Sequence, residues 1–152
     1  RSIELLSEYI NQYNAGGDQA LIDYLEGSRN FRTGFWQGYQ GQDVGAIVDL
    51  GNIERISLIK IGALQDIQSW IWLPKTVEIS ISKDKLSWTS VDLINAPLPA
   101  DQYGAHKKIY TAKANSNARY VKIHATYPGN CPDWHLGSGG KAWIFMDEIS
   151  VE

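Results

Sequence analysis

The sequence predicts an all-β protein folded as a sandwich of two antiparallel sheets. Three observations support this: short segments alternate apolar and polar residues, turn-forming residues separate them, and helical spacing is weak beyond the N-terminus. A period of two is typical of strands with one face on a core and the other in water. Many short strands separated by turns favour two stacked sheets.

The expected strands follow one another along the chain. The first, residues 3–13, fits a helix or a strand by its apolar spacing, and we expect a strand. The clearest is 77–82, where β-branched apolar residues occupy every odd position. The others are 46–50, 56–61, 120–125 and a closing strand around Asp147, with turns expected at 51–52, 83–85, 115–117 and 128–130 and a long surface loop over 95–103.

The composition fits one ordinary globular domain spanning residues 1–152. The chain has 43% hydrophobic and 20% charged residues and a net charge of −3, so it has no electrostatic footprint for nucleic acid or an anionic membrane. No apolar run is long enough to span a membrane. Cys131 is the only cysteine, which excludes an internal disulfide, and we expect it to be a small, partly buried residue.

The segment 131–152 carries the strongest functional signal. It begins as a loop with Trp134, His135 and several small residues, which suits a flat polar ligand. It ends in a strand where Asp147 and Glu148 interrupt an apolar run, which suits a metal or a buried ion pair. Adjacent residues of a strand point to opposite faces, so this carboxylate pair is not that of a glycosidase. The pattern favours a binding module over an enzyme.

Five motifs occur in a set order and carry a family resemblance. They are the segment 20–28 followed by Trp36, Ala-Ile-Val-Asp-Leu-Gly at 46–51, the segment 77–88, Ala-Arg-Tyr-Val-Lys-Ile at 118–123 and Met-Asp-Glu-Ile at 146–149. This order resembles the coagulation factor five/eight type C, or discoidin, domain. Further segments at 36–39, 69–74 and 134–145 resemble the C-terminal carbohydrate-binding module of bacterial family 20 β-N-acetylhexosaminidases, the chitobiase-like enzymes.

The resemblance implies a fold, a function and a location. The family fold is a jelly-roll β-sandwich, and the implied role is a non-catalytic module that targets an attached glycoside hydrolase to glycans. We expect terminal galactose, N-acetylglucosamine or N-acetylgalactosamine as ligands, and a monomer excised from the C-terminus of an exported bacterial protein. The alternatives are a structural module that packs on the parent catalytic domain, and a membrane- or protein-binding discoidin domain, which would need apolar spikes in basic surroundings.

The resemblance also implies one structural calcium ion. Its expected ligands are Asp23, Ser28 and Glu148, because a hard cation prefers carboxylate, hydroxyl and carbonyl oxygens. The alternative is that Asp23 starts a turn and Glu148 pairs with a basic residue. Two positions depart from the family pattern, since Tyr24 and Lys85 stand where the family has glycine. Lysine tolerates a positive φ poorly, so we expect a different hairpin turn at Lys85.

The candidate sugar-binding residues lie in three segments. Trp134 and His135, with Asp133 beside them, form the first. Trp70 and Trp72 alternate and should face one side, as a sugar platform, as core, or as a surface for the parent domain. The third is Arg32, whose guanidinium has the geometry to bind two hydroxyls. The remaining tryptophans, Trp36, Trp88 and Trp143, are expected to pack in the protein, and His106 and His124 to be surface residues.

Overall fold

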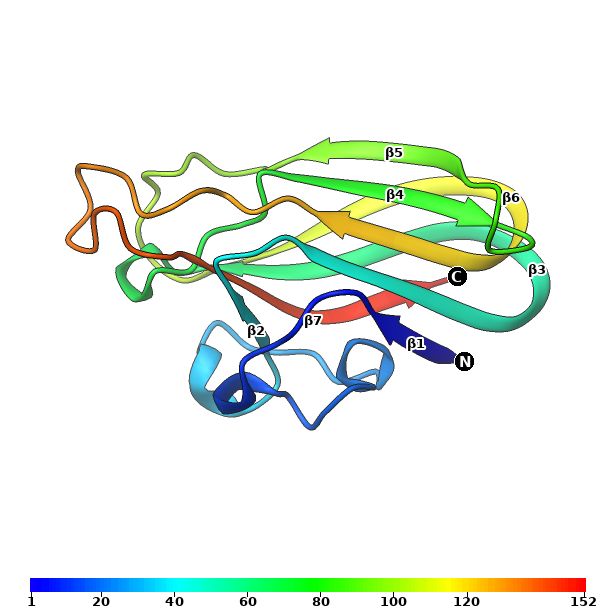
Figure 1. The fold of residues 1–152 in the computed structure, drawn as a ribbon, viewed down its shortest axis with the longest axis horizontal. Helices are drawn as coiled ribbons and strands as arrows, with labels where there is room; N and C mark the ends of the chain where they lie inside the picture. The colour runs from blue at the N-terminus through cyan, green and yellow to red at the C-terminus, as the bar shows by residue number, and fades with distance from the viewer.

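The computed structural model describes all 152 residues, as strands, loops and single 3₁₀ turns without an α-helix. Figure 1 shows that the long strands run roughly along the longest axis of the molecule. None of the helical turns has the length and apolar character needed to cross a membrane. The elements are β1 (Ser2–Leu5), η1 (Asn11–Tyr13), η2 (Ala20–Ile22), η3 (Phe31–Thr33), β2 (Gln37–Gln40), β3 (Val44–Gln65), η4 (Ile67–Ser69), β4 (Thr76–Ser82), β5 (Thr89–Asn95), β6 (His106–Ala125) and β7 (Trp143–Val151).

Two long strands, β3 and β6, belong to both layers of the sandwich. The first part of β3 and the last part of β6 pair with each other in a five-stranded sheet of order β1-β3-β6-β4-β5. Past the bend at the right of Figure 1, the same two strands continue into a four-stranded sheet of order β6-β3-β7-β2. All pairings are antiparallel, so the predicted two-sheet sandwich is confirmed.

The bend lies where the sequence predicted turns. Asp49 pairs with Tyr120 and Glu54 with Ala118, so four residues of β3 lie opposite one residue of β6. Such a bulge bends a strand strongly. Gly51, at φ 91°, takes the left-handed conformation that this corner needs. The expected turn at 51–52, and the one at 115–117, are therefore corners within continuous strands rather than chain reversals.

The core fills the space between the two sheets. Its main cluster joins buried residues from both layers, among them Val48, Ile59, Ile79 and Val121. These are the inward positions of the alternating segments, as predicted. A second cluster is aromatic and lies on the outer side of the four-stranded sheet. It contains Phe31, Trp36, Leu64, Ile71 and Phe145, with Tyr13 and Trp143 at its border. Trp36 is buried as expected.

The N-terminal segment departs from its prediction. Only Ser2–Leu5 form a strand, and residues 6–36 run as loops and 3₁₀ turns beneath the sandwich in Figure 1. The Ile10 N–H still donates to Gly38 O, but residues 11–13 then form the 3₁₀ turn η1 instead of continuing a strand. The strand predicted over 3–13 is therefore wrong beyond Leu5.

The two non-glycine residues at the family's glycine positions keep a left-handed backbone. Tyr24 has φ 67° and Lys85 has φ 65°. Hydrogen bonds hold the strained turn at Lys85, where its N–H donates to Ser82 Oγ at 2.9 Å and its ammonium pairs with Glu4. The prediction of a different turn at Lys85 is wrong, because these contacts offset the cost of a positive φ.

The two termini lie side by side at one end of the sandwich, opposite the longest loops (Figure 1). The Arg1 guanidinium donates to Val151 O at 3.0 Å. The far end is formed by loops 66–75, 96–105 and 126–142, which we call the loop end. This arrangement separates the chain termini from the surface that carries the candidate sugar-binding residues.

Candidate functional site

The loop end presents two exposed aromatic rings on neighbouring loops. Trp134 is 51% exposed and Tyr103 is 51% exposed. Their ring centroids lie 6.2 Å apart at an interplanar angle of 62°. Neither ring is part of a core cluster. Exposed aromatic faces of this kind suit the apolar C–H face of a sugar ring.

A hollow of about 300 Å³ lies at the same end, lined by residues of the loops that carry these rings but by neither ring. Asn130 and Lys75 contribute polar side chains, and Leu98 and Pro132 contribute apolar wall. The Asn130 Oδ1 accepts from the Tyr127 hydroxyl at 2.9 Å, which fixes the amide and leaves its N–H groups available. A hollow with apolar walls and a few polar groups is typical of a small-ligand site, and exposed aromatic rings on the same loops add a surface on which a sugar can stack.

His135 does not belong to the ligand surface. It is 5% exposed, and its Nε2 lies 2.6 Å from Ile67 O, while its Nδ1 accepts from the Gly137 N–H at 2.9 Å. Nε2 therefore carries the proton and donates, and neither ring nitrogen is left for a sugar. The prediction of His135 as a ligand-binding residue is wrong. Its ring instead packs edge-on against Trp134, with centroids 6.0 Å apart, and positions that side chain.

Trp70 and Trp72 also lie inside the loop end. Trp72 is 4% exposed and its indole N–H donates to Ala100 O at 2.8 Å, which ties two loops together. Trp70 is covered by the glycine-rich loop, since a Cβ added to Gly137 or Gly140 would lie 2.4 or 2.6 Å from its ring. Trp72 belongs to a small buried cluster, and Trp70 packs against that cluster while partly buried. This arrangement fits the option that the pair packs inside the protein, and Trp72 also lines the hollow described above.

Asp133 and Arg32 have different outcomes. Asp133 is exposed on the same loop as Trp134. Arg32 lies on η3, where its guanidinium stacks 4.2 Å from the ring centroid of Phe31. Its segment lies beneath the sandwich in Figure 1, whereas the 131–140 loop lies at the far left. The structure therefore does not bring Arg32 to the loop end.

Tyr103 and Lys75 escaped the sequence analysis. Tyr103 lies in the polar segment 95–103 that was expected to be a surface loop, which the structure confirms. An aromatic residue in such a loop was the available signal. Lys75 gave none, because a lysine before a strand is an ordinary surface residue.

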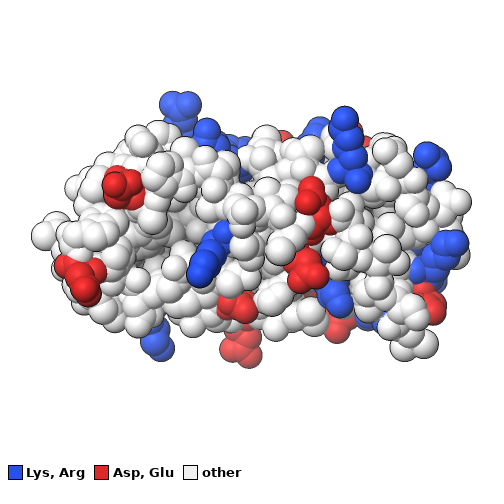
Figure 2. Space-filling model, turned by 90° about the horizontal axis from the view of Figure 1, so that it is seen from above, with Lys and Arg blue, Asp and Glu red and all other residues white.

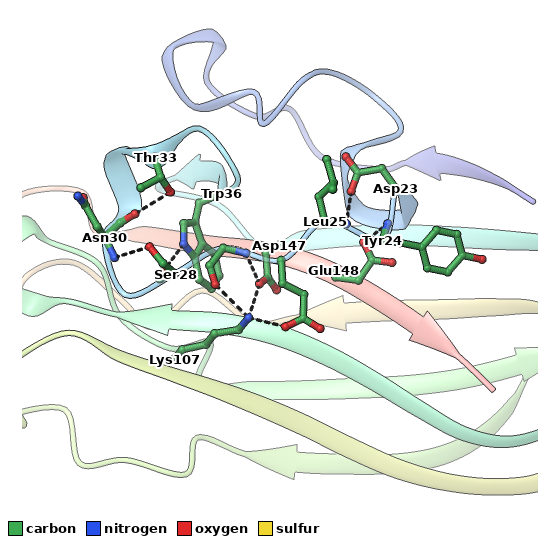
Figure 3. Close-up of polar contacts among 12 residues, drawn as sticks. Asp23, Tyr24, Leu25, Ser28, Asn30, Thr33, Trp36, Lys107, Asp147 and Glu148 are labelled. Atoms are coloured by element: carbon green, nitrogen blue, oxygen red, sulfur yellow. Dashed lines mark hydrogen bonds and ion pairs between the residues drawn. The ribbon is translucent and has the colours of Figure 1, made fainter.

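The second predicted site lies in the middle of the closing strand β7, in the region of Figure 3. There the ammonium of Lys107, from β6, contacts three oxygens at 2.9–3.0 Å: Glu26 Oε2, Gly27 O and Asp147 Oδ2. The Asp147 carboxylate is 1% exposed and also accepts from the Gly27 N–H at 2.9 Å, while its Oδ1 has no partner. The loop 23–28 is thus held on β7 by an internal cation.

Glu148 lies beside this cluster, on the other side of β7. It accepts from the Tyr24 N–H at 3.1 Å. Burial, together with the negative charges of Asp23 and Asp147, raises the pKa of Glu148 to about 7, although the Tyr24 hydrogen bond lowers it. Asp23 caps its own turn by accepting from the Leu25 N–H at 2.8 Å.

The three residues predicted to bind calcium do not converge. Asp23 and Glu148 are neighbours, but Ser28 lies on the far side of Lys107 and Asp147 in Figure 3. The Ser28 Oγ accepts from the Asn30 N–H, and its carbonyl accepts from the Trp36 indole. No group of three or more His, Cys, Asp or Glu side chains could hold a metal ion. The calcium site stays a prediction that this geometry does not fit.

Comparison with known proteins decides the family. The sequence matches the F5/8 type C domain over residues 6–143, most of its length. The chain belongs to the F5/8 type C domain family. No curated protein sequence matches this F5/8 type C domain.

Solved structures share the fold of this F5/8 type C domain. A chitosan-binding module from Paenibacillus sp. IK-5 has a TM-score of 0.59 at 13% identity, over 100% of this chain and 94% of that one. A CBM32 module from Clostridium perfringens in complex with GlcNAc-α-1,4-galactose has a TM-score of 0.57 at 10% identity, over 99% and 88%. A Ruminococcus gnavus GH29 fucosidase in complex with fucose matches over 99% of this chain and 24% of its own, at 15% identity and TM-score 0.58. The F5/8 type C domain thus has the fold of carbohydrate-binding modules.

The face drawn in Figure 2 bears on the membrane-binding alternative. Figure 2 shows acidic and basic side chains interspersed on one face, without a patch of one sign. Ion pairs also join basic and acidic side chains of different strands and loops, as between Arg119 and Asp49 at 2.8 Å. The basic surroundings expected of the membrane-binding alternative are therefore missing from this face.

Proposed function

We propose that this F5/8 type C domain is a non-catalytic carbohydrate-binding module whose sugar site is the loop end. The observation that supports it is the pair of exposed rings, Trp134 and Tyr103, on loops that also line a hollow edged by Asn130 and Lys75. The rings supply the apolar platform, and the amide and ammonium supply donors for sugar hydroxyls. Buried His135 and Trp72 hold the loops, so the site is preformed.

The proposed ligands are terminal galactose, N-acetylglucosamine or N-acetylgalactosamine residues. Two proteins of the same fold support this class through their own ligands, one with GlcNAc-α-1,4-galactose and one with chitosan. A shallow site that buries little surface binds weakly, and we expect a Kd of about 0.1–1 mM for one sugar. The gain to an attached enzyme comes from effective concentration.

We further propose that the domain serves a larger, exported bacterial glycoside hydrolase, such as a family 20 β-N-acetylhexosaminidase, and is itself monomeric. The adjacent termini support this arrangement, because a domain joined at either terminus would lie at the end opposite the sugar site. The fucosidase of the same fold supports it as well, since the matching part covers 24% of that longer chain.

A glycan array with three forms of the domain tests the proposal. Wild type should bind glycans with the terminal sugars named above, and Trp134→Ala should lose that binding. Leu136→Ala is the matched control, because Leu136 lies two residues away and is fully exposed, at 102%. It should bind as wild type does. Loss in both variants, or in neither, contradicts the assignment of Trp134.

A further inference from the structure

The largest hollow of the molecule lies away from the loop end, on the outer face of the five-stranded sheet. It measures about 580 Å³ and is lined by ten residues, only two of them hydrophobic. The strands β3, β6, β4 and β5 that carry it lie side by side in Figure 1. We call this hollow the sheet trough.

Residue size explains why the sheet is hollow here. Gly45, Ser80 and Ser90 place minimal side chains on three strands of one face. Register aligns them in two rows across the sheet. Gly45 pairs with His124 and His124 with Glu78, while Lys122 pairs with Ser80 and Ser80 with Ser90. Leu6 and Trp88 stand taller at the edges of this low floor.

Four polar side chains of the trough are unpaired, whereas Ser7, Asp43 and His124 beside them already pair within the protein. Glu78, Ser80, Ser90 and Lys122 form no hydrogen bond or ion pair within the protein. Elsewhere on the surface, opposite charges on neighbouring segments pair, as Lys60 does with Glu152 at 2.9 Å. An unpaired acid, an unpaired ammonium and two free hydroxyls within one hollow provide both donors and acceptors for a ligand.

Trp88 supplies the apolar element of the same hollow. Its ring is half-buried, and the Lys122 ammonium lies 4.2 Å from the ring centroid. This cation–π contact fixes the indole at the edge of the trough. The indole N–H forms no hydrogen bond with the protein and is a further free donor. A fixed aromatic ring beside free hydroxyl, carboxylate and ammonium groups is the chemistry that recognises a sugar chain.

We propose that the sheet trough is a second glycan-binding site, one that takes the interior of an extended neutral oligosaccharide. It crosses four strands, and three strand spacings of about 4.8 Å make it about 14 Å long, more than a single sugar ring needs. Its length suits a chain segment, whereas the loop end suits a terminal residue. The trough shares no lining residue with the hollow at the loop end, so neither site requires the other.

Titration followed by ¹H–¹⁵N NMR tests this site. The probes are four neutral hexasaccharides, β-1,4-linked N-acetylglucosamine, glucose, mannose and galactose, and the four monosaccharides. At least one hexasaccharide should shift the amides of Ser80, Trp88 and Lys122, and the monosaccharides should leave them unchanged. Trp88→Ala should weaken the hexasaccharide affinity at these amides about tenfold, which corresponds to about 1.4 kcal/mol.

Two variants separate the trough from the loop end. Trp134→Ala should leave the trough shifts intact, and Trp88→Ala should leave monosaccharide shifts at the loop end intact. Ser90→Arg fills the trough from an exposed position without touching the core and should also abolish the shifts. If none of the hexasaccharides shifts these amides in wild type, the proposal is overturned, whatever happens at Trp134.

Discussion

The loop end and the Lys107 cluster were both predicted as functional sites, and the fold treats them in opposite ways. At the loop end, buried residues tie three loops together and leave the Trp134 ring in solvent. At the Lys107 cluster, the polar groups turn inward and a lysine pairs with three of their oxygens, while the buried Asp147 Oδ1 has no partner. The difference teaches that a candidate binding group is recognised by its exposure to solvent, which Trp134 has and the Asp147 carboxylate lacks. A cluster of carboxylates whose cation comes from the chain itself is structural.

Removal of the internal cation should have the largest effect on stability. Lys107→Met leaves the buried Asp147 carboxylate without its partner, and we expect a loss of about 2–4 kcal/mol in the free energy of unfolding. Lys113→Met is the matched control, because Lys113 is exposed on the same strand, and it should change stability by no more than about 0.5 kcal/mol. Urea unfolding measures both. Equal effects of the two variants would show that Lys107 holds nothing.

Substitutions of two adjacent residues at the loop end should have different effects, on stability at His135 and on sugar binding at Trp134. His135→Ala removes the donor to Ile67 O and the acceptor of the Gly137 N–H and leaves a cavity, so it should cost about 2–3 kcal/mol. Trp134→Ala, at an exposed ring, should change stability by about 0.5 kcal/mol or less and should abolish sugar binding. Thermal unfolding and a binding assay on both variants check this. A stable His135→Ala variant with wild-type loops would contradict the buried role.

The pH dependence of stability should report Glu148. Its pKa of about 7 lies above its usual value, so the protonated form stabilises the fold and this contribution is lost as pH rises from about 5 to above 7. Wild type should therefore lose on the order of 1–2 kcal/mol between pH 5 and 8, allowing for solvent screening. Glu148→Gln should flatten this part of the profile. An unchanged slope in the variant would assign the titration to another group.

Calcium should have the smallest effect. Because Lys107 already occupies the loop oxygens and Ser28 faces its own turn, neither millimolar calcium nor a chelator should shift Tm. A bound ion at a hundredfold excess over its Kd would add about 2.7 kcal/mol, or about 5–10 °C for a domain of this size. A calcium-dependent rise of that order would restore the predicted metal site.

The sequence predicted those features that depend on local pattern. The alternating segments around Ile79 and Ile123 identified strands and their buried faces, and the exposed Trp134 followed from its place among glycines and prolines. The corners of β3 and β6 could not be predicted, because a glycine and an asparagine within apolar segments resemble a turn until the partner strand is known.

Long-range contacts decided the remaining differences. His135 and Trp134 are adjacent, and the sequence pattern does not tell which of them is buried. The carbonyl that accepts the hydrogen bond from His135 belongs to Ile67, far away in the sequence. Lys107 lies in an ordinary run of basic residues, and only the fold brings it to Asp147. Sequence reasoning therefore identified an exposed loop and a strand with buried carboxylates, but it could not identify the side chains that these contacts remove from solvent.

An NMR titration with GlcNAc-α-1,4-galactose compares the two regions in a single measurement. The account predicts that the amides of Tyr103, Asn130 and Trp134 shift on addition of the disaccharide, while those of residues 23–28 and Glu148 stay fixed. Trp134→Ala should remove the shifts, and Leu136→Ala should keep them. Shifts confined to the 23–28 loop and Glu148, with Tyr103 and Trp134 unmoved, would contradict the central claim that the sugar site is the loop end.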